Sequence, residues 1–187
     1  MFCLLGLAAC NRTPALPLKQ MFEVPAFTLT ERSGQPFDSA TMKGKVWVVS
    51  FFFATCHGTC PLLNSRMEAL QKATADLPGV SLLSVSTDEE DTPERLREYA
   101  TGQHAGDRWF FVTGKKDPVF RLGNEGFKIG LVEPDAVNAK EKFIHGTKIA
   151  LVDQQGWIRG YYDGVGDTAE ADSARLVADI KRLLATP

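Results

Sequence analysis

Residues 46–61 read VWVVSFFFATCHGTCP and mark the change from a buried strand to a helix. Residues 46–53 are β-branched and aromatic with little interruption, which is typical of a strand buried on both faces. Pro61 suits the first turn of a helix, where a missing N–H costs nothing. Apolar side chains then recur at helical spacing: Leu62, Leu63, Met67 and Leu70. The sequence therefore predicts a strand, a short turn and a helix.

Cys56 and Cys60 lie four residues apart at this junction. On a helical turn, residues with this spacing face the same way, with Cβ atoms about 5–6 Å apart. Two such sulfurs can form a disulfide after a small adjustment or bind one soft metal ion together. The partial positive charge at a helix N-terminus favours the thiolate, which is the form that attacks disulfides and binds metals. We therefore expect a reactive pair of thiols here.

The composition is that of one globular domain with a short extension. The chain has 187 residues, 44% of them hydrophobic, and a formal net charge of -2. Because this balance is slightly acidic and no block of Lys and Arg stands out, we expect no nucleic-acid partner. Of the four cysteines, Cys56 and Cys60 alone fall within the domain. A bridge across the three residues between them would constrain little, so a structural disulfide is the weaker interpretation.

The first ten residues read MFCLLGLAAC and resemble an export signal. They are apolar, too short to span a bilayer and end in small residues. The last four, LAAC, resemble a bacterial lipobox, in which the signal is removed and the cysteine becomes the lipidated first residue. We expect a signal segment over 1–9, a flexible linker over 10–23 that begins at lipidated Cys10, and a domain over 24–187. The protein would then be an exported, membrane-anchored lipoprotein that faces the periplasm or the cell exterior. A plain apolar N-terminus is the alternative.

The rest of the chain alternates strands with helices and then adds a hairpin. Apolar runs bounded by turn residues predict strands at 27–30, 35–37, 46–53, 80–86, 109–112, 148–153 and 157–162. Helices are expected to start near Pro61, Thr92, Lys115 and Thr168. We also expect an extended piece over 126–133 and a polar surface insertion over 134–142. This order predicts an α/β thioredoxin-like sandwich with an N-terminal β-hairpin and a late antiparallel hairpin. A peroxiredoxin or a flavodoxin-like domain shares the early part of the pattern.

Three segments resemble the Sco (SenC) family of copper-binding, membrane-tethered thioredoxin-fold proteins. They are KGK at 43–45 with the strand and cysteine motif that follow, SVSTD at 84–88 with DTP at 91–93, and FIHGT at 143–147. The resemblance spans residues 24–184. In that family a Cys-x-x-x-Cys pair and one remote histidine bind one copper ion, which implies Cys56, Cys60 and His145 as ligands here. Soft thiolates suit Cu(I), and an imidazole tolerates both Cu(I) and Cu(II).

The resemblance implies a copper chaperone that delivers its ion to a client copper protein, such as a subunit of respiratory cytochrome c oxidase, and we expect it to be a monomer. Zinc is the weaker metal, because a structural zinc would want a fourth protein ligand. The family commonly has an Asp inside the cysteine loop, where this chain has His57, and another before the histidine. Asp88 or Asp91 could replace these carboxylates, or could be solvated helix-start residues; His57 could tune the thiols or simply face solvent.

A thiol-disulfide oxidoreductase is the alternative function. In it, Cys56 and Cys60 would cycle between dithiol and disulfide to reduce the cysteines of partner proteins outside the cytoplasm. Such an enzyme needs one exposed thiolate of low pKa and a resolving thiol within reach. A peroxiredoxin-like peroxidase is a weaker alternative, since residues 54–56 do not match its peroxidatic loop.

Overall fold

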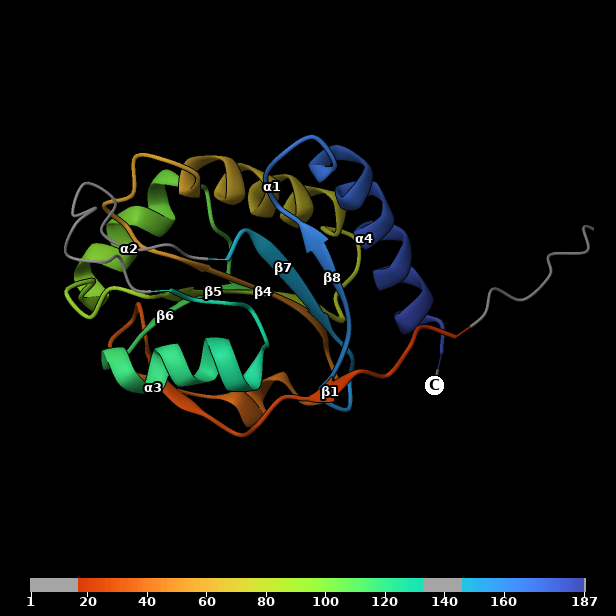
Figure 1. Cartoon of the computed structure of the whole chain (residues 1–187), viewed down its shortest axis with the longest axis horizontal. Coiled ribbons are helices and arrows are strands. Elements are labelled where there is room, and N and C mark those ends of the chain that lie inside the picture. Colours follow the sequence, from red (N-terminus) through yellow and green to blue (C-terminus); the bar gives the residue numbers. More distant parts are fainter. Residues whose placement is uncertain (1–16, 133–145, 187) are drawn as a thin grey trace, which may run out of the picture.

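The computed structural model describes residues 17–132 and 146–186. Its strands are β1 (Phe22–Glu23), β2 (Thr28–Glu31), β3 (Pro36–Asp38), β4 (Val46–Phe52), β5 (Val80–Ser86), β6 (Trp109–Thr113), β7 (Lys148–Val152) and β8 (Trp157–Asp163). Its helices are α1 (Cys60–Ala73), α2 (Pro93–Gly102), α3 (Lys116–Arg121) and α4 (Ala169–Leu184), with a short 3-10 helix η1 (Ser39–Met42) and a short π-helix η2 (Leu122–Gly126). The strands form one sheet in the order β1-β8-β7-β4-β5-β6-β2-β3. Figure 1 shows this curled sheet with α1, α2 and α4 on one face and α3 on the other. The predicted α/β thioredoxin-like fold is confirmed.

The centre of the sheet is the parallel pair β4 and β5. They run in register from Val46 opposite Val80 to Phe52 opposite Ser86, and every residue of both strands is buried. Since the strands are parallel, they end at the same edge of the sheet. The loop after β4, which carries Cys56 and leads to Cys60 at the start of α1, therefore meets the loop after β5. We call this edge the cysteine edge.

Side chains alternate between two apolar cores along β4, as the period of a strand requires. Val46, Val48 and Phe52 pack with α1, α2 and α4 on one face of the sheet. Trp47, Val49 and Phe51 pack with α3 and η2 on the other. Burial of both faces explains why this strand is a nearly continuous apolar run.

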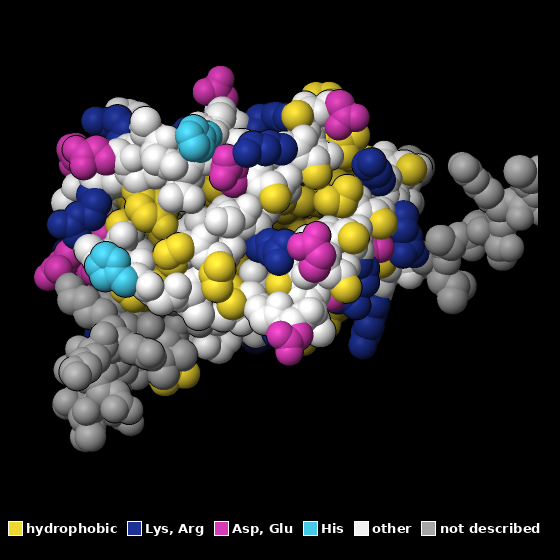
Figure 2. Space-filling model, turned by 90° about the horizontal axis from the view of Figure 1, so that it is seen from above, with side chains coloured by type: hydrophobic (Ala, Val, Ile, Leu, Met, Phe, Trp, Pro, Cys, Tyr) yellow, Lys and Arg dark blue, Asp and Glu magenta, His cyan; other side chains and the backbone are white. Residues whose placement is uncertain are grey.

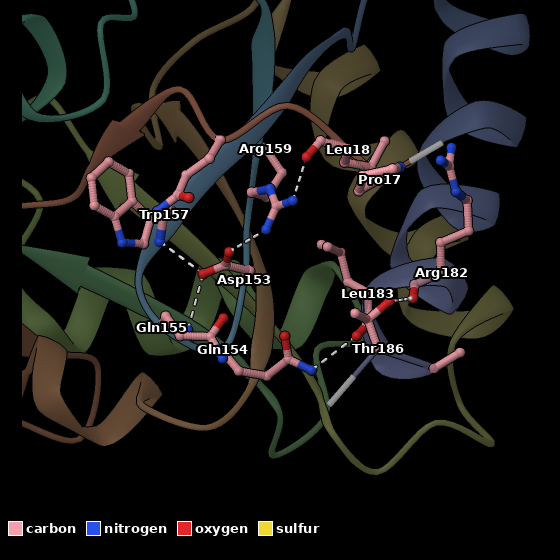
Figure 3. Close-up of a pocket in the computed structure, with 12 residues that line it drawn as sticks. Pro17, Leu18, Asp153, Gln154, Gln155, Trp157, Arg159, Arg182, Leu183 and Thr186 are labelled. Carbon is pink, nitrogen blue, oxygen red and sulfur yellow. Dashed lines mark hydrogen bonds and ion pairs between the residues drawn. The ribbon is translucent and has the colours of Figure 1, made fainter. Parts of the chain in front are cut away.

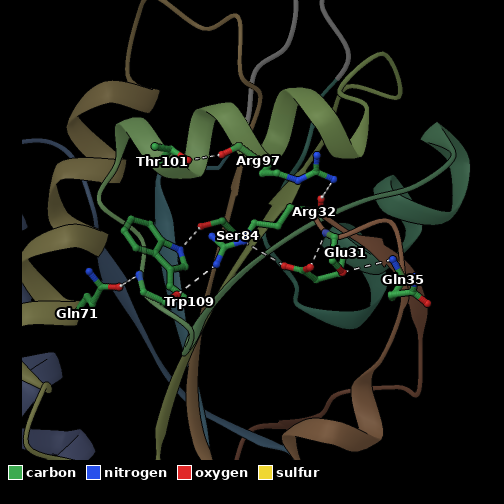
Figure 4. A network of polar contacts seen from close by, with 10 residues as sticks. Glu31, Arg32, Gln35, Gln71, Ser84, Arg97, Thr101 and Trp109 are labelled. Carbon is green, nitrogen blue, oxygen red and sulfur yellow. Dashed lines mark hydrogen bonds and ion pairs between the residues drawn. The ribbon is translucent and has the colours of Figure 1, made fainter.

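A buried polar chain crosses the middle of the sheet. The indole Nε1–H of Trp109 donates to Ser84 Oγ at 3.0 Å, and Ser84 Oγ lies 3.1 Å from Ser50 Oγ. Figure 4 shows the first of these bonds below α2, together with a bond from the Arg97 guanidinium to the backbone oxygen of Arg32. The first two contacts join β4, β5 and β6, and the third joins α2 to the turn between β2 and β3.

Both predicted hairpins are confirmed. β2 pairs with β3 and β7 pairs with β8, in both cases antiparallel. Gly34 and Gly156 adopt φ of 85° and 91° in the two turns, a left-handed conformation that glycine takes without strain. The helices expected near Pro61, Thr92, Lys115 and Thr168 are also present.

The extended piece expected over 126–133 is wrong at its start, where η2 continues α3 to Gly126 and Lys128 has a φ of 55°. Further on, Val132 forms an isolated β-bridge. The Asn124 side chain donates to the backbone oxygen of Leu131 at 3.0 Å and accepts from its N–H at 2.6 Å. These bonds satisfy the backbone of Leu131 without a neighbouring strand. The polar insertion expected over 134–142 lies outside the described residues.

The N-terminal segment lies beside the turn between β7 and β8, and Figure 3 shows Leu18 next to Arg159. The buried carboxylate of Asp153 accepts from the N–H groups of Gln155 at 3.0 Å and Trp157 at 2.9 Å, and pairs with the Arg159 guanidinium at 2.7 Å. Arg159 in turn donates to the backbone oxygens of Leu18 and Lys19. We call this arrangement the N-terminal clamp. It borders a cavity of about 490 Å³ between residues 17–20, the β7–β8 turn and the end of α4.

The N-terminal clamp and β1 place the start of the folded domain earlier in the chain than the sequence suggested. The linker was expected over residues 10–23, but Phe22 and Glu23 pair with Ile158 and Trp157 of β8. The Met21 N–H also donates to the Ile158 oxygen. The folded domain therefore extends upstream of residue 24. A strand of two residues is too short to give a periodic signal.

Candidate metal and thiol site

The cysteine pair lies at the cysteine edge, where β4 passes into α1. The chain turns directly after β4, and the Cys56 N–H donates to the backbone oxygen of Phe53 at 3.2 Å. The helix begins at Cys60, with Pro61 in its first turn as predicted. Cys56 therefore belongs to a turn and Cys60 to a helix, rather than both to one helical turn.

The two thiols differ in burial. Cys56 is half-buried, whereas Cys60 has an exposed fraction of 0%. Both are thiols in this structure, and their side chains are hydrogen-bonded to each other. Burial raises the pKa of the Cys60 thiol well above its ordinary value, and the bond with Cys56 raises it further. The expectation that the helix N-terminus favours a thiolate is therefore wrong for Cys60, because desolvation outweighs the helix dipole.

A buried polar pair behind Cys60 was missed by the sequence analysis. Asn64 lies one helical turn after Cys60, is fully buried, and donates from Nδ2 to the Tyr99 hydroxyl at 2.6 Å. The Tyr99 ring stacks on Phe52 with centroids 5.1 Å apart. Burial is the main cause that raises the pKa of Tyr99, and the nearby Cys60 and Cys56 thiols raise it further. An asparagine on the apolar side of the helix was the available signal.

Asp88 and Asp91 are buried, so the reading of them as solvated helix-start residues is wrong. Asp88 has an exposed fraction of 3% and its Oδ1 accepts from the Glu90 N–H at 3.0 Å. Asp91 has an exposed fraction of 0% and its Oδ2 accepts from the Ala54 N–H at 2.8 Å. Asp91 therefore contacts the turn that carries Cys56.

Of the remaining candidate residues, the structure describes His57 but not His145 or Cys10. His57 is exposed to solvent, in agreement with the plainer of its two interpretations. His145 and Cys10 lie outside the described residues, so their roles stay predictions. Within residues 17–132 and 146–186, no three His, Cys, Asp or Glu side chains gather as a metal site would require.

The start of β7 lies at the cysteine edge. The strand is antiparallel to β4, with Trp47 opposite Val152 and Val49 opposite Ala150, so β7 begins beside the place where β4 ends. A Cβ on Gly164 would stand 2.2 Å from the Leu63 side chain and 2.9 Å from the Thr147 oxygen. Thr147 therefore lies close to the first turn of α1.

The surface over the helices is mixed in character. Figure 2 shows the face covered by the helices, with hydrophobic side chains exposed between positive and negative groups. Leu62, one of the apolar residues at helical spacing, is 58% exposed. Leu63 takes the buried direction instead, since adjacent helical residues point apart. None of the helices in the described part of the chain is both long and apolar enough to cross a membrane.

The arrangement supports two kinds of chemistry. Two adjacent sulfurs, one of them accessible, can hold a soft metal ion if a further ligand joins them. The same two thiols can also be oxidised to a disulfide and reduced again.

Known proteins resemble this chain over most of its length. The SCO1/SenC family model matches residues 17–185. The SCO1 protein homolog of Bacillus subtilis (strain 168) is 29% identical over 164 residues, which cover 86% of this chain and 82% of the relative.

Solved structures show the same fold. A SCO1/SenC family lipoprotein from Bacillus anthracis superposes with a TM-score of 0.79 at 28% identity, over 92% of this chain and 99% of the other. BsSco, described as a member of the Sco family of cytochrome c oxidase assembly proteins with a disulfide switch, has a TM-score of 0.78 at 27% identity, over 91% and 99%. ScoI of Bradyrhizobium japonicum, solved with copper bound, shares the fold with a TM-score of 0.67 at 21% identity, over 87% and 99%.

Proposed function

Since the chain belongs to the SCO1/SenC family, we propose that it is a copper-binding assembly factor that holds one copper ion through Cys56, Cys60 and His145. The observation that carries the proposal is the pair of hydrogen-bonded thiols at the cysteine edge. Because the two thiol side chains interact directly, one ion can bind both of them. Two thiolates favour Cu(I) over harder ions.

The proposed third ligand, His145, precedes β7 by three residues. Support comes from the register of β7 and β4, which brings the start of β7 to the cysteine edge. It also comes from Thr147, whose oxygen lies close to the Leu63 side chain across Gly164. Two residues span at most about 7 Å, so the proposal requires the His145 imidazole to reach the sulfurs within that distance of Thr147.

Copper is the cargo of this proposal. The accessible Cys56 would be the first sulfur to meet the ion and the last to leave it. Cys60 would give up its proton on binding, since the thiolate is the ligand. Because burial holds the Cys60 pKa high, this proton loss opposes binding and makes copper affinity rise with pH.

We further propose that the ion goes to a client copper protein such as an oxidase subunit, and that Cys10 carries a lipid anchor outside the cytoplasm. The family description of BsSco and the lipoprotein from Bacillus anthracis support these two points. The N-terminal clamp lies at the β7–β8 turn, which is the opposite end of β4 from Cys56. A monomer anchored through its N-terminus would therefore present the cysteine edge away from the membrane.

Competition with a Cu(I) chelator tests the copper proposal. The reduced protein should bind one Cu(I), the double variant Cys56→Ser, Cys60→Ser should bind none, and His145→Ala should bind much more weakly. Binding of Cu(I) with unchanged affinity by the double variant would refute the proposal.

A thiol-disulfide oxidoreductase is the second candidate function. The observation in its favour is the unequal burial of the thiols, because a half-buried Cys56 can attack a partner while buried Cys60 resolves the mixed disulfide. The His145→Ala variant separates the two functions. If reduction of a partner disulfide is the function, the variant should keep that activity; if copper delivery is the function, it should lose copper binding.

A further inference from the structure

The turn between β4 and α1 is tied to the loop after β5 by buried hydrogen bonds. The Thr87 N–H donates to the Phe52 oxygen at 2.8 Å, and the Thr87 hydroxyl donates to the same oxygen at 3.2 Å. One residue further along the turn from Phe53, the Ala54 N–H donates to Asp91 Oδ2 at 2.8 Å. The path that leads to Cys56 is thus fixed from a segment more than thirty residues away.

Asp91 is itself held in place. The Ser86 hydroxyl donates to the same oxygen, Oδ2, at 2.6 Å. The Asp91 N–H donates to the Asp88 oxygen at 3.0 Å, and Thr92 directly after it caps α2 by accepting from the Arg95 N–H at 3.3 Å. The carboxylate therefore fixes the turn relative to the end of β5 and the start of α2.

The second oxygen of the carboxylate, Oδ1, is buried and accepts no hydrogen bond from the described residues. Asp91 Oδ1 lies 3.5 Å from the guanidinium of Arg95, whose side chain is 45% exposed. The Arg95 guanidinium compensates part of the negative charge. Both hydrogen bonds that Asp91 accepts end on Oδ2, so this oxygen is the one that fixes the turn.

We infer that Asp91 is a positioning residue: its Oδ2 fixes the Ala54 N–H and so sets where Cys56 stands relative to Cys60. The inference deepens the proposed function and rests on it for its copper consequence. Groups that orient a ligand in this way typically change metal affinity by about 10–100-fold when they are altered. The same effect must appear without copper, because the position of Cys56 also controls how readily it pairs with Cys60.

Two substitutions separate position from charge. Asp91→Asn keeps an acceptor oxygen at the same distance from the backbone and removes the charge. Asp91→Glu keeps the charge but displaces the oxygens by one methylene group. If positioning is the role, Asp91→Asn should behave like the unchanged protein and Asp91→Glu should be defective.

The primary readout is the equilibrium of the full chain with glutathione. Cys56 and Cys60 lose two protons and two electrons to form their disulfide, and oxidised glutathione is reduced to two glutathione thiols. Asp91→Glu should lower the equilibrium constant for this intramolecular disulfide by about 10-fold or more, with Asp91→Asn within about threefold of the unchanged protein. Cu(I) affinity, measured by chelator competition, should follow the same order.

Asp153→Glu is the matched control. Asp153 is also a buried carboxylate that accepts backbone N–H bonds in a turn, but it lies at the opposite end of the sheet. The Asp153→Glu substitution should lower the melting temperature. It should leave the disulfide equilibrium and the Cu(I) affinity unchanged at temperatures where the protein is folded. Such a result would show that the defect of Asp91→Glu is not a general loss of stability.

Equal disulfide equilibria in folded Asp91→Glu and the unchanged protein would overturn the inference, as would an equal defect in Asp91→Asn and Asp91→Glu. If the unchanged protein binds no Cu(I) but the disulfide equilibria differ as expected, Asp91 keeps its positioning role and the copper function fails instead.

Discussion

Each end of the central sheet has a buried carboxylate that accepts hydrogen bonds from a turn, but the two carboxylates have different roles. At the hairpin end, Asp153 accepts two backbone N–H bonds and pairs with Arg159, which grips the N-terminal segment. At the cysteine edge, Asp91 accepts one backbone N–H and one hydroxyl and supports a turn whose thiol is half-buried. The contacts at the hairpin end bind the N-terminal segment to the sheet, whereas the cysteine edge leaves one reactive group accessible. A buried carboxylate can thus serve stability at one end and the geometry of a site at the other.

Breaking the hairpin end should have the largest effect on stability. Asp153→Ala leaves the mostly buried Arg159 guanidinium without its partner and removes the acceptor for two N–H groups. We expect a loss of about 3 kcal/mol in the free energy of unfolding, because the remaining charge is left uncompensated. Urea denaturation checks this value. Cu(I) affinity should not change, and a tenfold loss of affinity in the folded variant would contradict the separation of the two ends.

Crowding the cysteine edge should have a smaller effect. A methyl group at Gly164 would stand 2.2 Å from the Leu63 side chain and 2.9 Å from the Thr147 backbone oxygen. We expect Gly164→Ala to cost about 2 kcal/mol, the usual range for overpacking. Gly58→Ala, in the loop between the cysteines, is the matched control, since a Cβ there meets nothing within 4 Å. A drop in thermal stability for Gly58→Ala equal to that of Gly164→Ala would contradict this assignment of the contacts.

Alkaline pH should weaken the metal-free protein through Cys60. Burial raises the pKa of this thiol in the folded state, while the unfolded chain loses the proton at pH of about 8.5. The contribution of the neutral thiol is fully present below that pH and is lost as pH rises above it. Between about pH 8.5 and 10 we expect stability to fall by up to ~1.4 kcal/mol per pH unit. Denaturant titrations of the unchanged protein and of Cys60→Ser check this, and identical slopes for the two would contradict it.

The smallest effect should come from Leu62. Its side chain is 58% exposed on α1. Leu62→Ser should change the free energy of unfolding by no more than about 0.5 kcal/mol, as surface substitutions usually do. Leu63→Ala, at a fully buried neighbour, should cost about 3 kcal/mol in the same denaturation experiment. Similar costs for the two leucines would show that the helix is rotated from the orientation described.

Much of the fold could be predicted from the sequence, because local patterns encode it. The strands at Val46–Phe52 and Val80–Ser86 are apolar runs bounded by turns, and Thr92 followed by Pro93 is a local signal for a helix start. β1 could not be predicted, since two residues carry no period. The exposure of Leu62 could not be predicted either, because helical spacing alone does not decide between two adjacent leucines.

The site was predictable only in part. The spacing of Cys56 and Cys60 identified the thiols, and a resemblance supplied His145, which stays a prediction. The positioning of the turn by Asp91 could not be read from the chain, because Ala54 and Asp91 meet only through the parallel pairing of β4 and β5. The high pKa of Cys60 also depends on burial by distant elements, which outweighs the local effect of the helix terminus.

X-ray absorption of the full chain loaded with one equivalent of Cu(I) tests the central claim most directly. The account predicts two sulfur ligands and one imidazole nitrogen on the copper, with loss of the nitrogen in His145→Ala and of the sulfurs in Cys56→Ser, Cys60→Ser. Copper bound through nitrogen and oxygen alone, or a spectrum that neither variant changes, would contradict it.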